Sequence, residues 1–260
     1  MRGRARADTR DQQATGGDMR VRDFSVLTFD CYGTLIDWET GIVDQILPWL
    51  EAHGATPSRD ALLKAFGQRE SHHQEASPGL RYPELLARVH QDIARDFDVA
   101  PDDEAARAFG HSVGDWPAFP DSPGALAYLK RHYKLVILSN VDHGSFRLSA
   151  ERLGVGFDAV FTAEDIGSYK PDPRNFQYML DRLAELGVDR REILHTAESL
   201  HHDHVQAKRF GLATCWISRR AGHGRTASGR EGTTITPDFR FETLDGLAEA
   251  HRAEAPASAT

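Results

Sequence analysis

The stretch Phe24-Ser-Val-Leu-Thr-Phe-Asp-Cys-Tyr-Gly-Thr-Leu-Ile-Asp37 decides the fold. Its apolar, β-prone run at 26–29 predicts a buried strand that delivers Asp30 into a Tyr-Gly-Thr turn. Ligands of open α/β sheets bind at the carboxyl ends of the strands. The stretch therefore predicts a parallel strand that ends in an active site at Asp30. The alternative is a surface strand with an aspartate at a turn.

The segment after Asp37 changes from the period of a strand to that of a helix. One predicted helical face consists of Leu85, Leu86, Val89, Ile93 and Phe97. Residues 39–115 thus predict several helices and no strand, as an all-helical unit inserted after the first strand. The run Trp116-Pro-Ala-Phe-Pro120 breaks this pattern and marks the return to the rest of the fold.

From Pro120 onward, apolar strand patterns alternate with helical ones. The predicted strands are 134–138, 159–161, 192–196, 214–217 and 239–241, and the predicted helices are 144–153, 175–186, 203–210 and 244–250. This alternation is typical of an α/β fold with a doubly wound parallel sheet.

These patterns divide the chain into a core, an insertion and two ends. The predicted parts are a disordered extension at 1–21, a Rossmann-like core at 22–38 and 117–252, a helical cap domain at 39–116, and a flexible tail at 253–260. Residues 221–234, rich in Gly, Arg, Thr and Ser, predict a mobile loop. Translation could begin at Met1 or at Met19.

Composition narrows the class of protein. The balance of 31 Lys and Arg against 39 Asp and Glu gives a net charge of −8, which argues against nonspecific nucleic-acid binding. No apolar run approaches the roughly 20 residues of a membrane span, and the arginine-rich start lacks the apolar region of a secretory signal. Cys31 and Cys215 lie in apolar runs, so we expect reduced, buried thiols and a cytoplasmic protein.

Polar clusters follow the predicted strands. They are Asp30 with Thr34, Ser139 with Asn140, Lys170, and Glu198 with Asp203. The ends of parallel strands converge on one crevice, so we expect these side chains to meet there. A carboxylate nucleophile, hydroxyl and amide donors, and a lysine suffice for covalent catalysis through an aspartyl ester. The lysine would keep Asp30 ionised.

Four motifs in this order resemble the haloacid dehalogenase superfamily. They are Asp30-Cys-Tyr-Gly-Thr-Leu-Ile-Asp37, Leu138-Ser-Asn140, Tyr169-Lys-Pro-Asp172 and Glu198-Ser-Leu-His-His-Asp203, and the resemblance covers nearly all of residues 23–250. It implies a hydrolase with Asp30 as nucleophile and a helical cap. Thr34, Lys170 and Asp203 are the other catalytic residues implied.

Tyr32 distinguishes the branches of this superfamily. Phosphatases carry a second aspartate there to protonate the leaving alcohol, whereas tyrosine, with a pKa near 10, is a poor acid at neutral pH. A halide needs no proton, so the motif resembles the type II L-2-haloacid dehalogenases. This implies attack by Asp30 on the halogen-bearing carbon, hydrolysis of the ester to a 2-hydroxy acid, and no cofactor. A small carboxylate would be the substrate.

Other positions depart from that branch. Glu198 with Asp203 resembles the acidic pair of Mg²⁺-dependent members, so the alternative is a phosphatase with Asp30, Tyr32, Glu198 and Asp203 at the metal. A catalytically silent binding protein is a second alternative. Phe176 stands where the dehalogenases have a tyrosine. For the expected cap arginine the candidates are Arg81, Arg69 and, by position, Lys64.

The predicted substrate contacts are Cys31, Tyr32, Ser139, Asn140 and Arg81. Several have simpler interpretations: Cys31 as a buried filler, Asp203 as a helix cap, and His201, His202 and His204 as solvated or supporting side chains rather than metal ligands. An apolar cap face could also support a homodimer.

Overall fold

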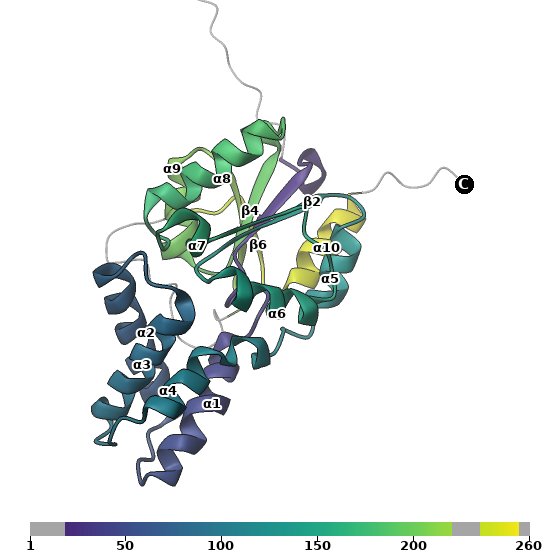
Figure 1. Cartoon of the computed structure of the whole chain (residues 1–260). Coiled ribbons are helices and arrows are strands. Elements are labelled where there is room, and N and C mark those ends of the chain that lie inside the picture. The colour runs from purple at the N-terminus through teal and green to yellow at the C-terminus, as the bar shows by residue number, and fades with distance from the viewer. Residues whose placement is uncertain (1–18, 220–234, 255–260) are drawn as a thin grey trace, which may run out of the picture.

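The computed structural model describes residues 19–219 and 235–254, and its centre is a six-stranded parallel sheet (Figure 1). The strands are β1 (Val26–Phe29), β2 (Lys134–Ser139), β3 (Ala159–Thr162), β4 (Ile193–Ala197), β5 (Ala213–Ile217) and β6 (Phe239–Phe241). Their spatial order is β3-β2-β1-β4-β5-β6, the doubly wound order of Rossmann-like folds. The predicted fold class is confirmed.

Strand β1 lies at the point where the strand order reverses. It pairs with β2 on one side and with β4 on the other, so that Phe29 is level with both Ile137 and Thr196. All four of its residues are buried. Leu27 and Phe29 pack in one apolar cluster and Val26 in the other, because successive side chains point to opposite faces. Asp30 therefore leaves the sheet at its centre.

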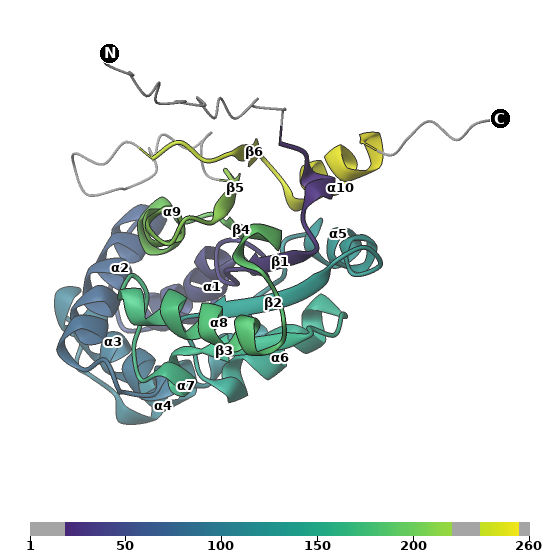
Figure 2. The ribbon, with the colours of Figure 1, turned by 90° about the horizontal axis from the view of Figure 1, so that it is seen from above.

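Helices cover both faces of the sheet (Figures 1 and 2). Helices α5 (Ser122–Leu129), α6 (His143–Leu153) and α10 (Leu244–Ala253) pack in the first cluster, and α8 (Pro173–Glu185) and α9 (Val205–Arg209) in the second. The short α7 (Ala163–Ile166) follows β3. The remaining turns are η1 (Val21–Asp23), η2 (Ser112–Asp115), η3 (Arg190–Glu192) and the π-helical η4 (Leu200–His204).

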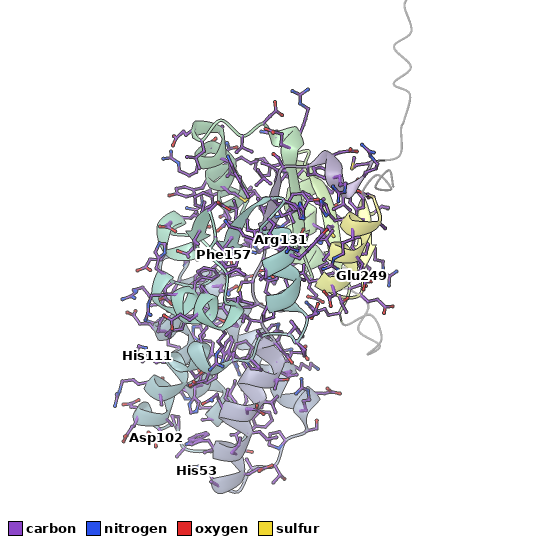
Figure 3. All side chains as sticks on the ribbon, turned by 90° about the vertical axis from the view of Figure 1, so that its right-hand side faces the viewer. His53, Asp102, His111, Arg131, Phe157 and Glu249 are labelled. Atoms are coloured by element: carbon purple, nitrogen blue, oxygen red, sulfur yellow. The ribbon has the colours of Figure 1, made fainter. Side chains whose placement is uncertain are left out.

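The helical insertion comprises α1 (Trp38–Ala52), α2 (Arg59–Ala76), α3 (Tyr82–Asp96), α4 (Asp103–Gly110) and η2. Asp37, Ser58 and Asp102 cap its helices by accepting hydrogen bonds from backbone N–H groups. It lies beside one end of the sheet, and Figure 3 shows His53 and Asp102 at its far end. Its separateness as a domain with limits at 39 and 116 stays a prediction.

The chain enters and leaves the helical insertion at one point. The Asp37 N–H donates to the Pro117 carbonyl at 2.8 Å, and the Phe119 N–H donates to Leu35 at 3.0 Å. Ile36 also forms an isolated bridge with Ala118. These bonds join the two connections to each other within a few residues of Asp30 in the chain, so the insertion stands next to the end of β1.

Some boundaries differ from the sequence predictions. Val21 is buried in η1 and its N–H bonds the Glu254 carboxylate at 3.0 Å, so the predicted extension and tail are both too long. Ser199, not Asp203, caps η4, and the helix predicted at 203–210 therefore begins earlier. The extension at 1–18, the loop at 221–234 and the tail at 255–260 lie outside the described residues. None of the described helices is both long and apolar enough to cross a bilayer.

Gly41 provides a test of packing between α1 and the return segment. A Cβ there would lie 2.3 Å from Cγ of the buried Trp116, whereas a Cβ at Gly67 in α2 would meet nothing within 4 Å. We expect Gly41→Ala to lower the free energy of unfolding by about 1–3 kcal/mol through overpacking. Gly67→Ala should leave it unchanged or raise it by up to about 1 kcal/mol, because alanine favours helix. Urea denaturation of both variants measures the difference, and equal stabilities would contradict this packing.

Candidate active site

Asp30 stands at the end of β1 with both carboxylate oxygens engaged. Thr34, one turn further on, donates its hydroxyl to Oδ2 at 2.7 Å, and Lys170 donates to Oδ1 at 2.9 Å. The side chain is nearly buried. Burial raises the pKa of Asp30, while the Lys170 charge and the Thr34 hydrogen bond act to lower it. Once ionised, so poorly hydrated a carboxylate is a strong nucleophile.

Lys170 connects the site. Its Nζ donates to Asp30 Oδ1 at 2.9 Å, to the Leu138 carbonyl at 2.9 Å and to Asp203 Oδ1 at 2.6 Å. Asn140 holds its backbone by accepting from the Lys170 N–H and donating to the Lys170 carbonyl. Burial acts to lower the pKa of Lys170, but the two carboxylates outweigh it and raise the pKa. The ammonium is thus a fixed charge.

Asp203 is held from a second side by a histidine that the sequence analysis did not single out. His195 Nε2 lies 3.2 Å from Asp203 Oδ1, and its Nδ1 lies 2.8 Å from Thr28 Oγ1 on β1. Burial acts to raise the pKa of Asp203, but Lys170 and His195 hold it well below its usual range. A histidine inside the strand predicted at 192–196 was the available signal. The Oδ2 atom of Asp203 has no hydrogen-bond partner among the described residues.

The hydroxyl of Tyr32 is engaged in a hydrogen bond with Ser149. The hydroxyl lies 2.9 Å from Ser149 Oγ, and the ring packs edge-on against Trp116. Burial raises the pKa of Tyr32 well above 10. Tyr32 is therefore a much weaker proton donor at neutral pH than a second aspartate would be at this position.

A cavity of about 200 Å³ opens between the sheet and the helical insertion. Its core side includes Asp30, Tyr32, Asn140, Lys170, Glu198 and Asp203, and its insertion side includes Trp38, Phe66, Glu70, Gln74 and Tyr82. Phe66, Glu70 and Gln74 recur every four residues and so share one face of α2. That spacing shows that they share a face, but it does not show that this face of α2 meets the core.

Several predicted substrate contacts lie elsewhere. The Cys31 side chain is fully buried in the apolar core, and Ser139 is buried without lining the cavity. Arg81 is exposed, does not line the cavity, and pairs with two core residues, Glu164 at 3.4 Å and Asp142 at 3.9 Å. These three predictions therefore find no support in the placement of the side chains. Arg69 pairs with Asp96 instead.

The nearby histidines do not form a metal centre. His204 is buried, not solvated, and its Nε2 lies 3.0 Å from the Ala197 carbonyl. His202 lines the cavity, and burial lowers its pKa to about 4, so it is neutral at pH 7. His201 lies in the same π-helical turn.

The side chains present do not fit a Mg²⁺ ion as they are arranged. Glu198 lines the cavity with Asp30 and Asp203, but the Lys170 ammonium already bridges the two aspartates. Within the described ranges, no three acidic, histidine or cysteine side chains are grouped so that they could hold a metal ion. The four residues predicted as metal ligands, Asp30, Tyr32, Glu198 and Asp203, thus line the same cavity but are not arranged around one point where an ion could bind.

Comparison with known proteins assigns this arrangement to a family. A family model described as haloacid dehalogenase-like hydrolase matches residues 24–196. The (S)-2-haloacid dehalogenase of Pseudomonas sp. (strain YL) is 28% identical over 230 residues, covering 86% of this chain and 92% of that protein. The pyrimidine 5'-nucleotidase YjjG of Escherichia coli (strain K12) is 29% identical over 130 residues, 48% of this chain and 54% of that protein.

A solved structure with the same fold is the L-2-haloacid dehalogenase from Xanthobacter autotrophicus. Its TM-score is 0.73 at 20% identity, with 89% of this chain and all of that chain covered. Identity at this level bears on the fold alone. The shared architecture nevertheless extends over both the sheet and the helical insertion.

Removal of the Lys170 charge should make stability depend on pH. In Lys170→Met two buried carboxylates face each other unpaired, which raises their folded-state pKa above the unfolded value. The folded state then binds more protons than the unfolded state, so stability falls as pH rises through the raised pKa. We expect a loss of about 3–5 kcal/mol at pH 8 and a smaller loss at pH 5, measured by urea denaturation.

Lys130→Met is the matched control. Lys130 pairs with Asp158 at the surface, so its loss should change stability by less than about 1 kcal/mol at either pH. Equal losses for Lys170→Met at pH 5 and pH 8 would show that Lys170 does not balance the two carboxylates.

Proposed function

Because the chain belongs to the haloacid dehalogenase-like hydrolases, we propose that it releases halide from a small 2-haloacid through an ester on Asp30. Two features together support this proposal most. The Asp30 carboxylate is held in a fixed position, and the residue two positions later is a tyrosine rather than a second acid. Asp30 is held by Thr34 and Lys170, while Tyr32 is committed to Ser149. Asp30 can therefore attack carbon, but the residue at position 32 is not a carboxylic acid that could protonate the leaving alcohol of a phosphate ester.

The proposed first step is displacement at carbon. A carboxylate oxygen of Asp30 forms a bond to the halogen-bearing carbon, and the halide leaves with the electron pair of the broken bond. Thr34 and Lys170 fix the direction of Asp30 before attack. Trp38, Phe66 and Trp116 line the cavity and give it an apolar wall beside Asp30.

The proposed second step is hydrolysis of the ester. Water attacks the Asp30 carbonyl, the 2-hydroxy acid leaves, and Asp30 is regenerated as a carboxylate. Asp203 supports this step, since it lines the same cavity and its Oδ2 accepts no hydrogen bond from the described residues. Asp203, held ionised by Lys170 and His195, takes one proton of the attacking water and passes it to the departing oxygen of the 2-hydroxy acid. The second proton of the water is released to solvent when Asp30 returns to its carboxylate form.

The second candidate is an Mg²⁺-dependent phosphatase. Its support is the position of Glu198 beside the two aspartates and the likeness to a nucleotidase. A catalytically silent binding protein is a third candidate, against which the intact arrangement of Asp30, Thr34 and Lys170 argues. A cytoplasmic location and a homodimer stay proposals; the buried, unpaired Cys31 and Cys215 support a reducing compartment.

Halide release provides the direct test. We expect the purified protein to release chloride from 2-chloropropionate at a rate that EDTA does not change, because the leaving halide needs neither a proton nor a metal. Asp30→Asn should lose this activity below detection. Ion chromatography of halide and phosphate, with 2-haloacids and small phosphate esters as substrates, measures both. EDTA-sensitive phosphate release without halide release would favour the second candidate.

An isotope experiment tests the ester itself. In a single turnover in H₂¹⁸O with enzyme in excess, the label should enter the Asp30 carboxylate, because water attacks the ester carbonyl. Mass spectrometry of the peptide that contains Asp30 detects it. Label found first in the hydroxy acid would indicate direct attack by water on the substrate.

Tyr32 provides a test of the leaving group. Tyr32→Phe should reduce halide release by less than about tenfold, well short of the 10²–10⁴-fold typical of a lost general acid or base. The substitution keeps the ring and removes the hydroxyl that bonds Ser149. Steady-state kinetics of Tyr32→Phe beside Ser149→Ala, which removes the same bond, gives the comparison. A loss of a hundredfold or more in the first variant alone would assign Tyr32 a proton-transfer role.

A further inference from the structure

The cavity offers little positive charge to an anionic substrate. Lys170 is the only lysine or arginine among the described residues that line it, and its Nζ already donates three hydrogen bonds. Four carboxyl groups line the same space, those of Asp30, Glu70, Glu198 and Asp203. A substrate carboxylate must therefore be received by neutral donors.

Glu70 is the carboxyl group on the insertion side of the cavity. It projects from α2 on the same face as Phe66 and Gln74, and the Tyr82 hydroxyl donates to its Oε1 at 2.8 Å. It forms no ion pair with any lysine or arginine in the described ranges. Phe66, one turn before it in α2, and Trp38, whose ring packs on that of Phe66, line the same cavity. Such a setting disfavours a negative charge.

The titratable groups that face Glu70 do not supply a positive charge. Tyr82 from α3 and Tyr169 from the segment before α8 interact with it electrostatically, and both are neutral at pH 7. Across the cavity stand Asp30, Glu198, Asp203, the fully engaged Lys170 and the neutral His202. Burial raises the pKa of Glu70 to about 7, against the hydrogen bond from Tyr82.

We propose that protonated Glu70 donates a hydrogen bond to the substrate carboxylate and is the residue by which the helical insertion recognises the acid end of the substrate. This inference rests on the proposed function, because it assumes that the substrate is a small carboxylate. Tyr82 occupies Oε1, which leaves the other oxygen to carry the proton and donate into the cavity. The Gln74 amide, one turn along the same face, is a second neutral donor.

The proposal fixes the sign of a pH dependence. An ionised Glu70 would repel the carboxylate, so binding requires its proton. Affinity then falls as pH rises past about 7, where the Glu70 pKa lies, approaching about tenfold per pH unit. Above that pH each binding event takes up a proton, because the bound anion raises the pKa of Glu70 further.

Calorimetry with the product-like anion L-2-hydroxypropionate tests this without turnover. At pH 8, titrations in two buffers of different ionisation enthalpy should show uptake of close to one proton per wild-type site. Glu70→Gln keeps a neutral N–H donor, so it should bind within about tenfold of the wild type at pH 7 with no proton uptake. Glu75→Gln on the exposed side of α2 is the matched control and should behave as wild type.

The kinetic counterpart is the pH profile of kcat/KM for 2-chloropropionate. The fall above pH 7 should disappear in Glu70→Gln and persist in Glu75→Gln. Wild-type binding without proton uptake, or uptake that survives in Glu70→Gln, would overturn the inference. So would binding of 2-chloroethylammonium in place of the carboxylate, which would make Glu70 the partner of a cation.

The two proposals can fail separately. Carboxylate binding with Glu70-dependent proton uptake, but without halide release from any 2-haloacid, would support this inference and contradict the dehalogenase. Halide release with a Glu70-independent profile would leave the dehalogenase in place and remove the role of Glu70.

Discussion

The buried ammonium of Lys170 between Asp30 and Asp203 is the interaction on which the rest of the site depends. Two carboxylates side by side in a site removed from water repel each other unless a cation or a shared proton intervenes. Lys170 supplies that cation and donates to both at 2.9 and 2.6 Å. Its third bond, to the Leu138 carbonyl, anchors it to the end of β2. The cation that balances the two carboxylates is therefore held in place by the backbone of the sheet.

The sheet order explains why these groups meet. Asp30 follows β1, the strand at which the order reverses, and Asp203 lies in the π-helical turn after β4. Lys170 comes from the segment that follows α7, and its backbone is held by Asn140 at the end of β2. The neighbours of β1 thus each contribute one side of the site. His195 on β4 adds support from within the sheet by contacting both Thr28 and Asp203.

The helical insertion forms one wall of the cavity. It contributes aromatic walls and only one carboxyl, Glu70, with Tyr82 beside it. A protonated carboxyl can donate a hydrogen bond where an ionised one repels an anion. The proposed chemistry is centred on Asp30 of the core, whereas the proposed recognition of the substrate uses Glu70 of the insertion.

The sequence by itself determined the fold class, the helical insertion after the first strand and the group Asp30, Thr34, Lys170 and Asp203, because strand periodicity and motif spacing are local properties. Tertiary structure alone decided which insertion residues face the cavity. A helix presents several faces, and only packing against the core selects Glu70 over Arg81 or Lys64. It also decided that Cys31 and Ser139 are buried beside the cavity rather than in it. The sequence shows a histidine in the strand at 192–196, but only the pairing of β1 with β4 brings His195 to Thr28, 167 residues away, while it also contacts Asp203.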